Sequence, residues 1–503
     1  MPRLYPLFAT AGLCAVTLAT PPWAEDAPPP VDQFALNALV TSGQPGQAFL
    51  QAFEAGDELT EFSFDANRGV GANVGEGRRF ARVPRADLAG DGEWAQHFPT
   101  REGGPNATSC IACHAAPAPN GAGDVALNVV VDPAHSGDPS QFLERNTPPL
   151  FALGIPQRLA DEMTLELATQ RLAAEAEACT KGIATTALNA KGVGFGTLTL
   201  HRRAESPCKL QPDSSQLTGI DADLIVKPFG WKGSHASLRG FTRDAAHNEL
   251  GMQAVELVGD QDGDFDGVTD ELTVGDLTAL TIYMAALERP VSTIELANLG
   301  LQEMPEAQRR QITRGEVLFA LTDCSSCHIP QMTLNDPTFS EPSRVAGYVD
   351  ATLPSGADPV ALGLTADSAI HVDLTQDQPN NQVKLANGTT HHLGAVERRN
   401  GQAIARWFTD FKRHDMGAAL ADPADPTGLG AATFMTRSLA GVGSTGPWLH
   451  DGRATTLDEA IRLHGGAAAD SRSQYVNLSQ QAQESIVAFL EAQVIYTSGE
   501  EDH

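Results

Sequence analysis

The strongest constraint on this chain comes from two pentapeptides that share the pattern Cys-x-x-Cys-His. They are Cys110-Ile-Ala-Cys113-His114 and Cys324-Ser-Ser-Cys327-His328. This pattern is the attachment signature of c-type haem, because two thiols can add to the haem vinyl groups and the histidine can bind the iron. A zinc site, a redox-active dithiol or a disulfide could use the same cysteines, but zinc normally needs two further ligands in a compact partner motif, and neither run has one nearby. The sequence therefore predicts two covalently attached haems.

Length, composition and charge narrow the class of protein. The chain has 503 residues, enough for about three average domains or two larger ones. Its 42% hydrophobic and 19% charged residues are typical of a soluble globular protein. A formal net charge of −29 disfavours nucleic-acid binding, which needs basic patches. Because an acidic protein can attract a basic redox partner, we expect a small electron-donor protein such as a cytochrome c or a cupredoxin.

The N-terminus has the pattern of a cleaved secretory signal over residues 1–24. Arg3 supplies the positive start, residues 7–20 are apolar but too few to span a bilayer, and Ala24 ends a plausible cleavage site. No later segment reaches the roughly 18 apolar residues that a membrane span requires. We therefore expect export to the periplasm without a stable membrane anchor, followed by a disordered start at residues 25–34.

The remaining cysteines predict a disulfide. Of seven cysteines, Cys14 leaves with the signal and four belong to the pentapeptides, so Cys179 and Cys208 remain. Export permits a disulfide between them, and the alternative is two separate buried thiols. In the loop-entropy model, closing about 30 residues adds roughly 3–4 kcal/mol to the stability.

A repeat follows each pentapeptide. Thr147-Pro-Pro-Leu150-Phe-Ala-Leu-Gly154 matches Thr436-Arg-Ser-Leu439-Ala-Gly-Val-Gly443, and residues 231–238 match residues 450–457 without gaps. This shared order indicates duplication of one haem domain. We therefore expect a mainly α fold of two cytochrome c-like haem domains, with long loop insertions and a little β structure.

The predicted divisions follow from the repeat and from proline-rich segments. They are an N-terminal domain at 35–289 with an insertion near 155–225, a linker at 290–311, and a C-terminal domain at 312–497 with an insertion near 329–405. Within the first insertion, residues 194–200 are strand-like.

The repeat also predicts the second ligand of the His328 iron. Thr456-Leu-Asp-Glu459 is a capping-box pattern, so we expect a helix to begin there, with His464 on its apolar face. Because a haem must be buried in this half, His464 is the predicted ligand. The alternative is Met416, in the loop-like run His414-Asp-Met-Gly417, since thioether ligation is common in c-type cytochromes.

The first half has Ala245 at the position that matches His464. We therefore expect the far side of the His114 iron to be open. Glu249 lies one helical turn beyond Ala245, where a carboxylate could move the proton needed to split peroxide; the alternative is an exposed helix glutamate. Three histidines could instead close this iron: His135, His235 and His247.

These residues resemble the bacterial di-haem oxidoreductase family, which is related to the di-haem cytochrome c peroxidases. The matching stretches lie between about residues 100 and 495 and include residues 109–114, 147–154, 229–232, 247–252, 414–417, 448–453 and 464–466. The resemblance implies two haem domains packed so that both haems face one interface. It further implies that the first haem is peroxidatic and the second transfers electrons, that Trp231 assists transfer between them, and that Glu249 is the distal acid. His464 stands where the peroxidases carry a methionine ligand, which implies a lower reduction potential.

An acidic run predicts a calcium site. Between Asp260 and Glu271, carboxylates recur at alternate positions with a glycine for the turn, as in an EF-hand-like loop. If the loop starts at Asp262, its closing position falls on Thr273, and Asp270 or Glu271 could serve instead. The predicted ligands are Asp262, Asp264, Asp266 and Asp270, and the alternative is a solvated acidic turn.

The sequence thus predicts a periplasmic di-haem redox enzyme that reduces peroxide or a related oxidant. Two alternatives stay open because fold alone does not determine function. One is a non-catalytic electron-transfer cytochrome with both irons closed, and the other is a di-haem oxygenase or oxidase of an organic substrate.

Overall fold

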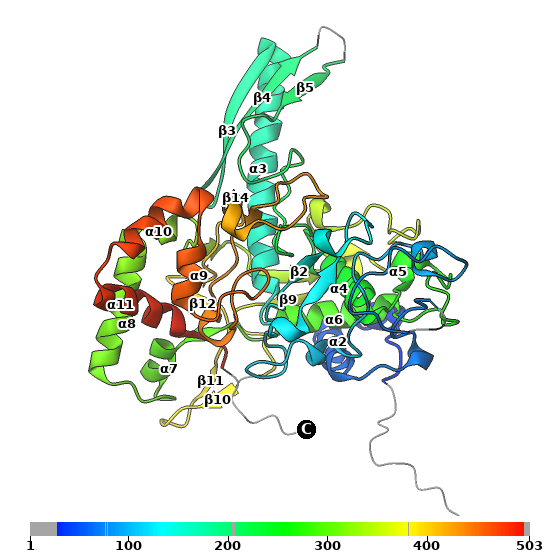
Figure 1. The fold of residues 1–503 in the computed structure, drawn as a ribbon, viewed down its shortest axis with the longest axis horizontal. Helices are drawn as coiled ribbons and strands as arrows, with labels where there is room; N and C mark the ends of the chain where they lie inside the picture. The colour runs from blue at the N-terminus through cyan, green and yellow to red at the C-terminus, as the bar shows by residue number, and fades with distance from the viewer. Residues whose placement is uncertain (1–27, 76, 78, 204–206, 381, 497–503) are drawn as a thin grey trace, which may run out of the picture.

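The computed structural model describes residues 28–75, 77, 79–203, 207–380 and 382–496 (Figure 1). The predicted signal peptide, with Cys14, lies outside these residues, as does the first part of the predicted disordered start. The rest of that start is structured from Asp32, whose carboxylate caps the helix beginning at Gln33. Within the described part of the chain, no helix is both long enough and apolar enough to cross a bilayer.

Most of the regular elements are short, and irregular segments separate many of them. The α-helices are α1 (Gln33–Thr41), α2 (Pro45–Glu61), α3 (Gly154–Lys181), α4 (Leu238–Ala245), α5 (Val255–Val258), α6 (Val274–Ala286), α7 (Thr293–Leu299), α8 (Glu306–Leu321), α9 (Leu457–Leu463), α10 (Ala469–Val476) and α11 (Gln480–Glu491). The strands are β1 (Val129–Val131), β2 (Leu143–Arg145), β3 (Ile183–Ala190), β4 (Val193–Arg202), β5 (Leu210–Asp213), β6 (Val291–Ser292), β7 (Met332–Leu334), β8 (Thr338–Glu341), β9 (Ile370–Asp373), β10 (Gln382–Lys384), β11 (Thr390–His392), β12 (Glu397–Arg399), β13 (Gln402–Ala405), β14 (Arg413–Asp415), β15 (Thr433–Met435) and β16 (Gln493–Val494). The longest elements are the helices α2, α3 and α8 and the strands β3 and β4.

The predicted mainly α fold is wrong. Helices account for 36% of the structure and strands for 16%, with the strands spread over many small sheets. Many strands have only two to four residues and pair with partners far along the chain, as β6 does with β16 and β7 does with β13. Strands this short contain no stretch of alternating apolar and polar residues long enough to be recognised in the sequence. The fold class was therefore mispredicted because segments with a loop-like sequence form short strands, and these pair with strands far away along the chain.

Each half contains a pair of crossing helices in which a glycine allows close approach. In the first half α2 packs on α6, and a Cβ on Gly56 would collide with the carbonyl oxygen of Ala279. In the second half α8 packs on α11, and a Cβ on Gly315 would collide with the carbonyl oxygen of Ser485. Figure 1 shows α2, α4 and α6 on one side of the molecule and α8 to α11 on the other. The same pairing in both halves supports the repeat.

The first insertion forms an arm that projects from the body in Figure 1. Helix α3 packs along the antiparallel sheet β3–β4–β5, and β4 includes the predicted strand-like residues 194–200. Cys179 at the end of α3 and Cys208 before β5 are joined by a disulfide bond. The arm is therefore linked covalently near its tip.

The second insertion packs against the first half. Strands β8 and β9 contact α6, and their Phe339 and Val372 are fully buried in the same apolar core as the first-half helices. The predicted linker at residues 290–311 is also structured, because it contains β6, α7 and the start of α8. The second insertion therefore shares an apolar core with the first half.

Candidate active site

One cavity of about 680 Å³ connects the two pentapeptides. His114 lines it in the first half and His328 in the second half. Each pentapeptide begins with a 3₁₀-helical turn, η3 (Cys110–Ala112) and η7 (Cys324–Ser326), and the histidine N–H bonds to the carbonyl of the first cysteine. The turn therefore places both thiols and the imidazole against one space.

The orientation and the charge state of both pentapeptide histidines suit them to bind a metal. The Nδ1 of His114 donates to the Pro148 carbonyl at 2.8 Å, and that of His328 donates to the Phe408 carbonyl at 3.3 Å. Burial lowers the pKa of each imidazole to about 4, so both rings are neutral near pH 7. Since the carbonyls hold Nδ1, the Nε2 of each ring is left to bind a metal.

His464 lies opposite His328. Helix α9 begins at the predicted cap, where the Thr456 side chain accepts from the Glu459 N–H. At its other end His464 donates from Nδ1 to the Ala460 carbonyl at 2.8 Å, and its ring centroid lies 6.5 Å from that of His328. A metal with imidazole nitrogens at about 2 Å on opposite sides would place the centroids roughly 6 Å apart. The geometry therefore fits one metal between these two rings.

Met416, the alternative ligand, lines the same cavity just beyond β14. The ring that faces His328 is nevertheless that of His464. Beside them is a pair that the sequence did not predict, in which His414 Nε2 lies 2.8 Å from Asp410. Although burial lowers it, the hydrogen bond to Asp410 raises the pKa of His414 to about 9. The pair lies next to Cys327, a proximity that the linear sequence does not reveal.

The first half repeats the local structure but lacks the ligand. An isolated β-bridge joins Phe229 to His235, and one joins Trp448 to Ala454 at the matching positions. The capped helices α4 and α9 follow, so that Ala245 ends one where His464 follows the other. Ala245 lines the cavity, where its methyl group cannot bind a metal. The repeat read from the sequence is therefore present in the backbone, with a different side chain at its functional position.

Glu249 lies in the π-helix η6 (Ala246–Leu250), which continues α4. Such π-helical turns are frequent at functional sites. Its side chain is half-buried and lines the cavity. Burial, with a smaller contribution from Asp244, raises the pKa of Glu249 to about 7. Burial, and next Glu249, raise the pKa of the Cys110 thiol to about 12, and both residues line the same cavity.

The three alternative histidines of the first half are placed differently. His135 is exposed and does not line the cavity. His247 belongs to η6 itself and is buried, so that burial, followed by Arg101, lowers its pKa. It does not line the cavity either. Only His235 reaches the cavity, with its ring against Phe241.

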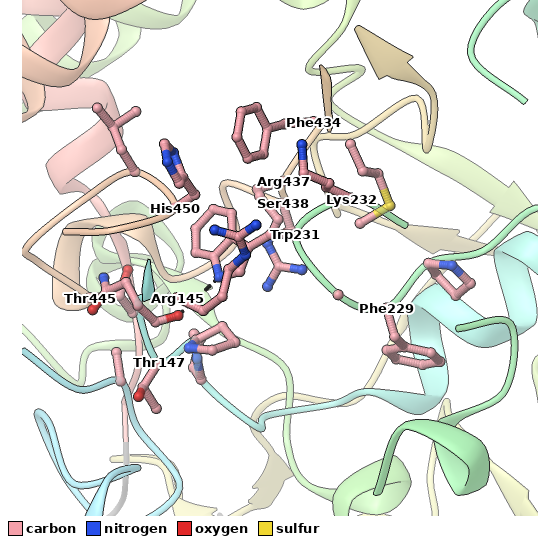
Figure 2. A pocket seen from close by; sticks show the side chains of 18 of the residues that line it. Arg145, Thr147, Phe229, Trp231, Lys232, Phe434, Arg437, Ser438, Thr445 and His450 are labelled. Carbon is pink, nitrogen blue, oxygen red and sulfur yellow. Dashed lines mark hydrogen bonds between the residues drawn. The ribbon is translucent and has the colours of Figure 1, made fainter. Parts of the chain in front are cut away.

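Trp231 lies in the cavity between the two halves (Figure 2). Its indole N–H donates to the Asn146 carbonyl at 3.0 Å, and the Arg437 guanidinium lies 4.9 Å from its ring centroid. Burial lowers the pKa of Arg437 to about 10, and its side chain has no hydrogen bond or ion pair within the described part of the chain. A carboxylate-bearing cofactor would supply the missing negative charge.

A buried ion cluster lies beside Trp231 and joins the halves. Asp422 accepts two hydrogen bonds from Arg145, both at 2.9 Å, and Lys232 lies 3.0 Å away. His450, which occupies the position matching Trp231, stacks on Phe434 with centroids 4.4 Å apart. No sequence pattern pointed to this cluster, because its members come from distant segments.

The acidic loop lies away from this cavity. Ligand atoms of Asp262, Asp264 and Asp266 lie within 4.8 Å of one another. Asp270, the fourth predicted ligand, is exposed at a φ of 56°, whereas the neighbouring Glu271 is buried.

The residues around the cavity fit haem on three observations: neutral imidazoles with free Nε2 atoms, paired thiols at the start of each motif, and an unpaired guanidinium. The histidines and the cysteines were named from the sequence, but the state of the imidazoles was not. The third was missed because no local pattern marks an arginine that lacks a partner.

Comparison with known proteins finds a similarity to di-haem redox proteins in the second half of the chain. Residues 375–493 match the model of the family described as "Di-haem oxidoreductase, putative peroxidase". The resemblance drawn from the sequence motifs is thereby confirmed.

Two solved structures are similar at low identity. The first is Kuenenia stuttgartiensis hydrazine synthase pressurised with xenon, with 19% identity over 44% of this chain and 57% of that chain and a TM-score of 0.22. The second is a MauG-like protein associated with microbial copper homeostasis, with 15% identity over 67% of this chain and 87% of that chain and a TM-score of 0.27. The chain therefore spans little more than half the length of the hydrazine synthase chain. No curated protein matches it.

Proposed function

We propose that this chain, whose residues 375–493 match the di-haem oxidoreductase family, is a periplasmic c-type enzyme that reduces peroxide or a related oxidant. Electrons would enter at the haem held by His328 and His464 and reach the haem held by His114, where the oxidant reacts. One observation carries this proposal. The ring centroids of His464 and His328 lie 6.5 Å apart, whereas the matching position in the first half, which contains His114, is Ala245.

When bound, the haem irons would supply the electron exchange and the reduction of the oxidant. His464 and His328 would hold one iron closed, which suits electron transfer. At the haem held by His114, the small side chain of Ala245 would leave room for a small oxidant. Reduction of one peroxide to two waters takes two electrons and two protons, so a proton carrier is needed near this space.

Glu249 is suited to carry that proton. Its pKa of about 7 lies near the operating pH, where a carboxyl group can both accept and release protons. Between the halves, Trp231 is held by Asn146 and by Arg437, which supports a role in relaying electrons. The Arg437 charge disfavours a positive charge on the indole, so we expect a bound carboxylate that pairs with Arg437 to make the indole easier to oxidise.

Covalent attachment is tested by mass spectrometry under denaturing conditions. We expect the mature chain to carry the mass of two haems. Cys110→Ser and Cys324→Ser variants should each weaken retention of one haem only. Loss of both haems on denaturation of the wild-type protein would contradict c-type attachment.

Catalysis is tested by mixing the half-reduced protein with hydrogen peroxide in a stopped-flow instrument. Wild-type protein should show one low-spin haem and one that binds cyanide and reacts with peroxide. Glu249→Gln should lower turnover about 100-fold or more while haem reduction by a donor is retained. If neither haem binds cyanide or reacts with peroxide, the protein is instead an electron carrier in which His235 would be the second ligand of the first iron.

The partner and the location are proposed from charge and from the N-terminal pattern. With a net charge of −29, the protein should react fastest with a basic cytochrome c or cupredoxin, at a rate that falls as salt increases. The check is the second-order rate constant between about 20 and 200 mM salt. A rate that rises with salt would argue against a basic donor. Fractionation of the native host should recover the protein in the periplasm.

A further inference from the structure

The acidic loop between α5 and α6 lies apart from the haem cavity and has its own chemistry. Asp262, Asp264 and Asp266 turn ligand oxygens to within 4.8 Å of one another. The turn depends on Gly267, whose φ of 89° favours glycine. Hard carboxylate oxygens at this spacing are the ligand type that calcium prefers.

Two buried carboxylate oxygens in this region have no partner within the described residues. Asp264 is 0% exposed and its Oδ1 is unbonded, while Oδ2 accepts from Arg101 at 2.7 Å. Glu271 is 7% exposed and its Oε1 is unbonded, while Oε2 accepts from the Gln253 N–H at 2.6 Å. A buried acceptor without a partner is costly, so both oxygens indicate a missing cation or donor.

The charges around the loop do not balance. Arg79 pairs with Asp266 at 2.8 Å, and Arg101 pairs with Asp264. Four carboxylates, those of the three aspartates and of Glu271, thus share two guanidinium groups when all are ionised. The excess matches the charge of a divalent cation.

We propose that this loop binds a calcium ion through Asp262, Asp264 and Asp266, whose ligand oxygens already lie within 4.8 Å of one another, and that Glu271, rather than Asp270, completes the site. The structure favours Glu271 because it is buried with a free oxygen, whereas Asp270 faces solvent. The sequence pattern alone left the closing ligand open between these two neighbours.

The same ligands hold the segment that follows Glu249. Arg101, paired with Asp264, also donates to the Gly251 carbonyl at 2.5 Å, and Glu271 accepts from the Gln253 N–H. Both contacts fix the backbone directly after η6, which carries Glu249. The bound ion therefore stabilises the support of that side chain; its consequence for catalysis rests on the proposed function, but the binding site does not.

Calcium binding is tested by calorimetric titration of the chelator-treated holoprotein with calcium chloride, and with magnesium chloride for comparison. We expect a calcium site with a Kd below about 1 mM and weaker magnesium binding. Calcium should raise the thermal midpoint and change the fluorescence of Trp94, which is linked to the loop through ring contacts of His97 with Trp94 and with Phe265. No heat and no shift of the midpoint, or tighter binding of magnesium, would overturn the proposal.

Single variants identify the ligands. Glu271→Gln and Asp264→Asn should weaken calcium binding at least tenfold, and the more exposed Asp262→Asn provides the same test if the buried variants fail to fold. Asp270→Asn and Asp260→Asn, which remove a charge from exposed positions of the same loop, should change the affinity by less than about twofold. Calcium binding that is unchanged in Glu271→Gln but lost in Asp270→Asn would refute the ligand set.

The link to η6 is measured by hydrogen exchange, which does not depend on activity. Calcium should slow exchange of the amides of residues 251–253 at least fivefold in the wild-type protein, and not in Asp264→Asn. Unchanged exchange at these amides despite calcium binding would refute the link but not the redox proposal. Inactivity towards peroxide while calcium binding and the slowed exchange are intact would refute the redox proposal but not the calcium site.

Discussion

At the scale of single residues, chemistry depends on how much water each side chain loses. Glu249 and His464 both lie just beyond the matching helices α4 and α9, yet burial acts on their pKa values oppositely. It raises the pKa of the carboxyl group and lowers that of the imidazole, so both groups favour their neutral forms. A neutral imidazole is a metal ligand, and a carboxyl group that titrates near pH 7 is a proton carrier.

Stability should therefore depend on pH at Glu249. Its pKa is about 7 in the folded protein against an ordinary value of 4.5, so the folded state binds more protons between these values. Ionised Glu249 then destabilises the fold at pH 8, and this penalty disappears below about pH 4.5. We expect Glu249→Gln to be more stable than wild type at pH 8 by up to about 3 kcal/mol, less the part screened by water in the cavity.

Denaturant unfolding at pH 5 and pH 8 measures this difference. The exposed Glu484→Gln serves as the control, because removing a charge there should have the same effect at both pH values. A Glu249→Gln advantage that is as large at pH 5 as at pH 8 would contradict the assignment.

At the scale of elements, the helices α4 and α9 show how a repeat diverges in function. Both begin at a hydroxyl cap, Ser237 in one and Thr456 in the other, and both follow an isolated β-bridge. The helix that ends at Ala245 continues into a π-helical turn carrying Glu249, whereas the other stops and presents His464. Conserved backbone geometry thus presents different chemistry to the two sides of the cavity.

Removing the cap of α9 should loosen His464. We expect Thr456→Ala to lower the unfolding free energy by about 1 kcal/mol, since the Glu459 N–H loses its acceptor. Because α9 has only seven residues, its fraying should also make the second haem easier to open, seen as faster cyanide binding and loss of the low-spin spectrum.

The matched control is Ser237→Ala in α4, whose cap is equivalent but whose helix supplies no predicted ligand. It should lose similar stability and leave the spectrum of the second haem unchanged. If both variants change that spectrum equally, the effect is not specific to α9.

At the scale of the whole molecule, the two halves are joined by buried charge as well as by apolar contact. Asp422 from the second half holds Arg145 and Lys232 from the first, and its side chain is 1% exposed. A second buried cluster joins Arg239 to Glu256 and to Glu341, which lies in the second insertion. Because these pairs are shielded from water, breaking one leaves an uncompensated charge.

Asp422→Asn should therefore cost about 3–5 kcal/mol, since two cations lose their buried partner while the side chain keeps its shape. The control is Asp451→Asn, which removes a carboxylate paired with the more exposed Arg453 of the same loop and should cost less than about 1 kcal/mol. Denaturation midpoints of both variants and the wild type provide the comparison, and equal losses would contradict a special role for Asp422.

Local patterns were sufficient for much of the candidate site. The two Cys-x-x-Cys-His runs, the repeat and the cap at Thr456 each depend on residues within a few positions of one another, and such spacing is visible in a sequence. Helix α9 and the strand within residues 193–202 accordingly lie where they were expected. The predicted fold class was wrong because the short strands pair with partners far along the chain, and such pairing is not visible in local spacing.

By itself, therefore, the sequence determined which residues can carry the chemistry: two pairs of thiols, their histidines, and one half that offers His464 where the other offers Ala245. Only the tertiary structure decided which of them meet. It brought His464 to face His328, placed the unpaired Arg437 over Trp231, and buried Glu271 rather than Asp270. The physical reason is that ligand geometry and charge balance depend on side chains from distant segments, and desolvation depends on everything that packs around them.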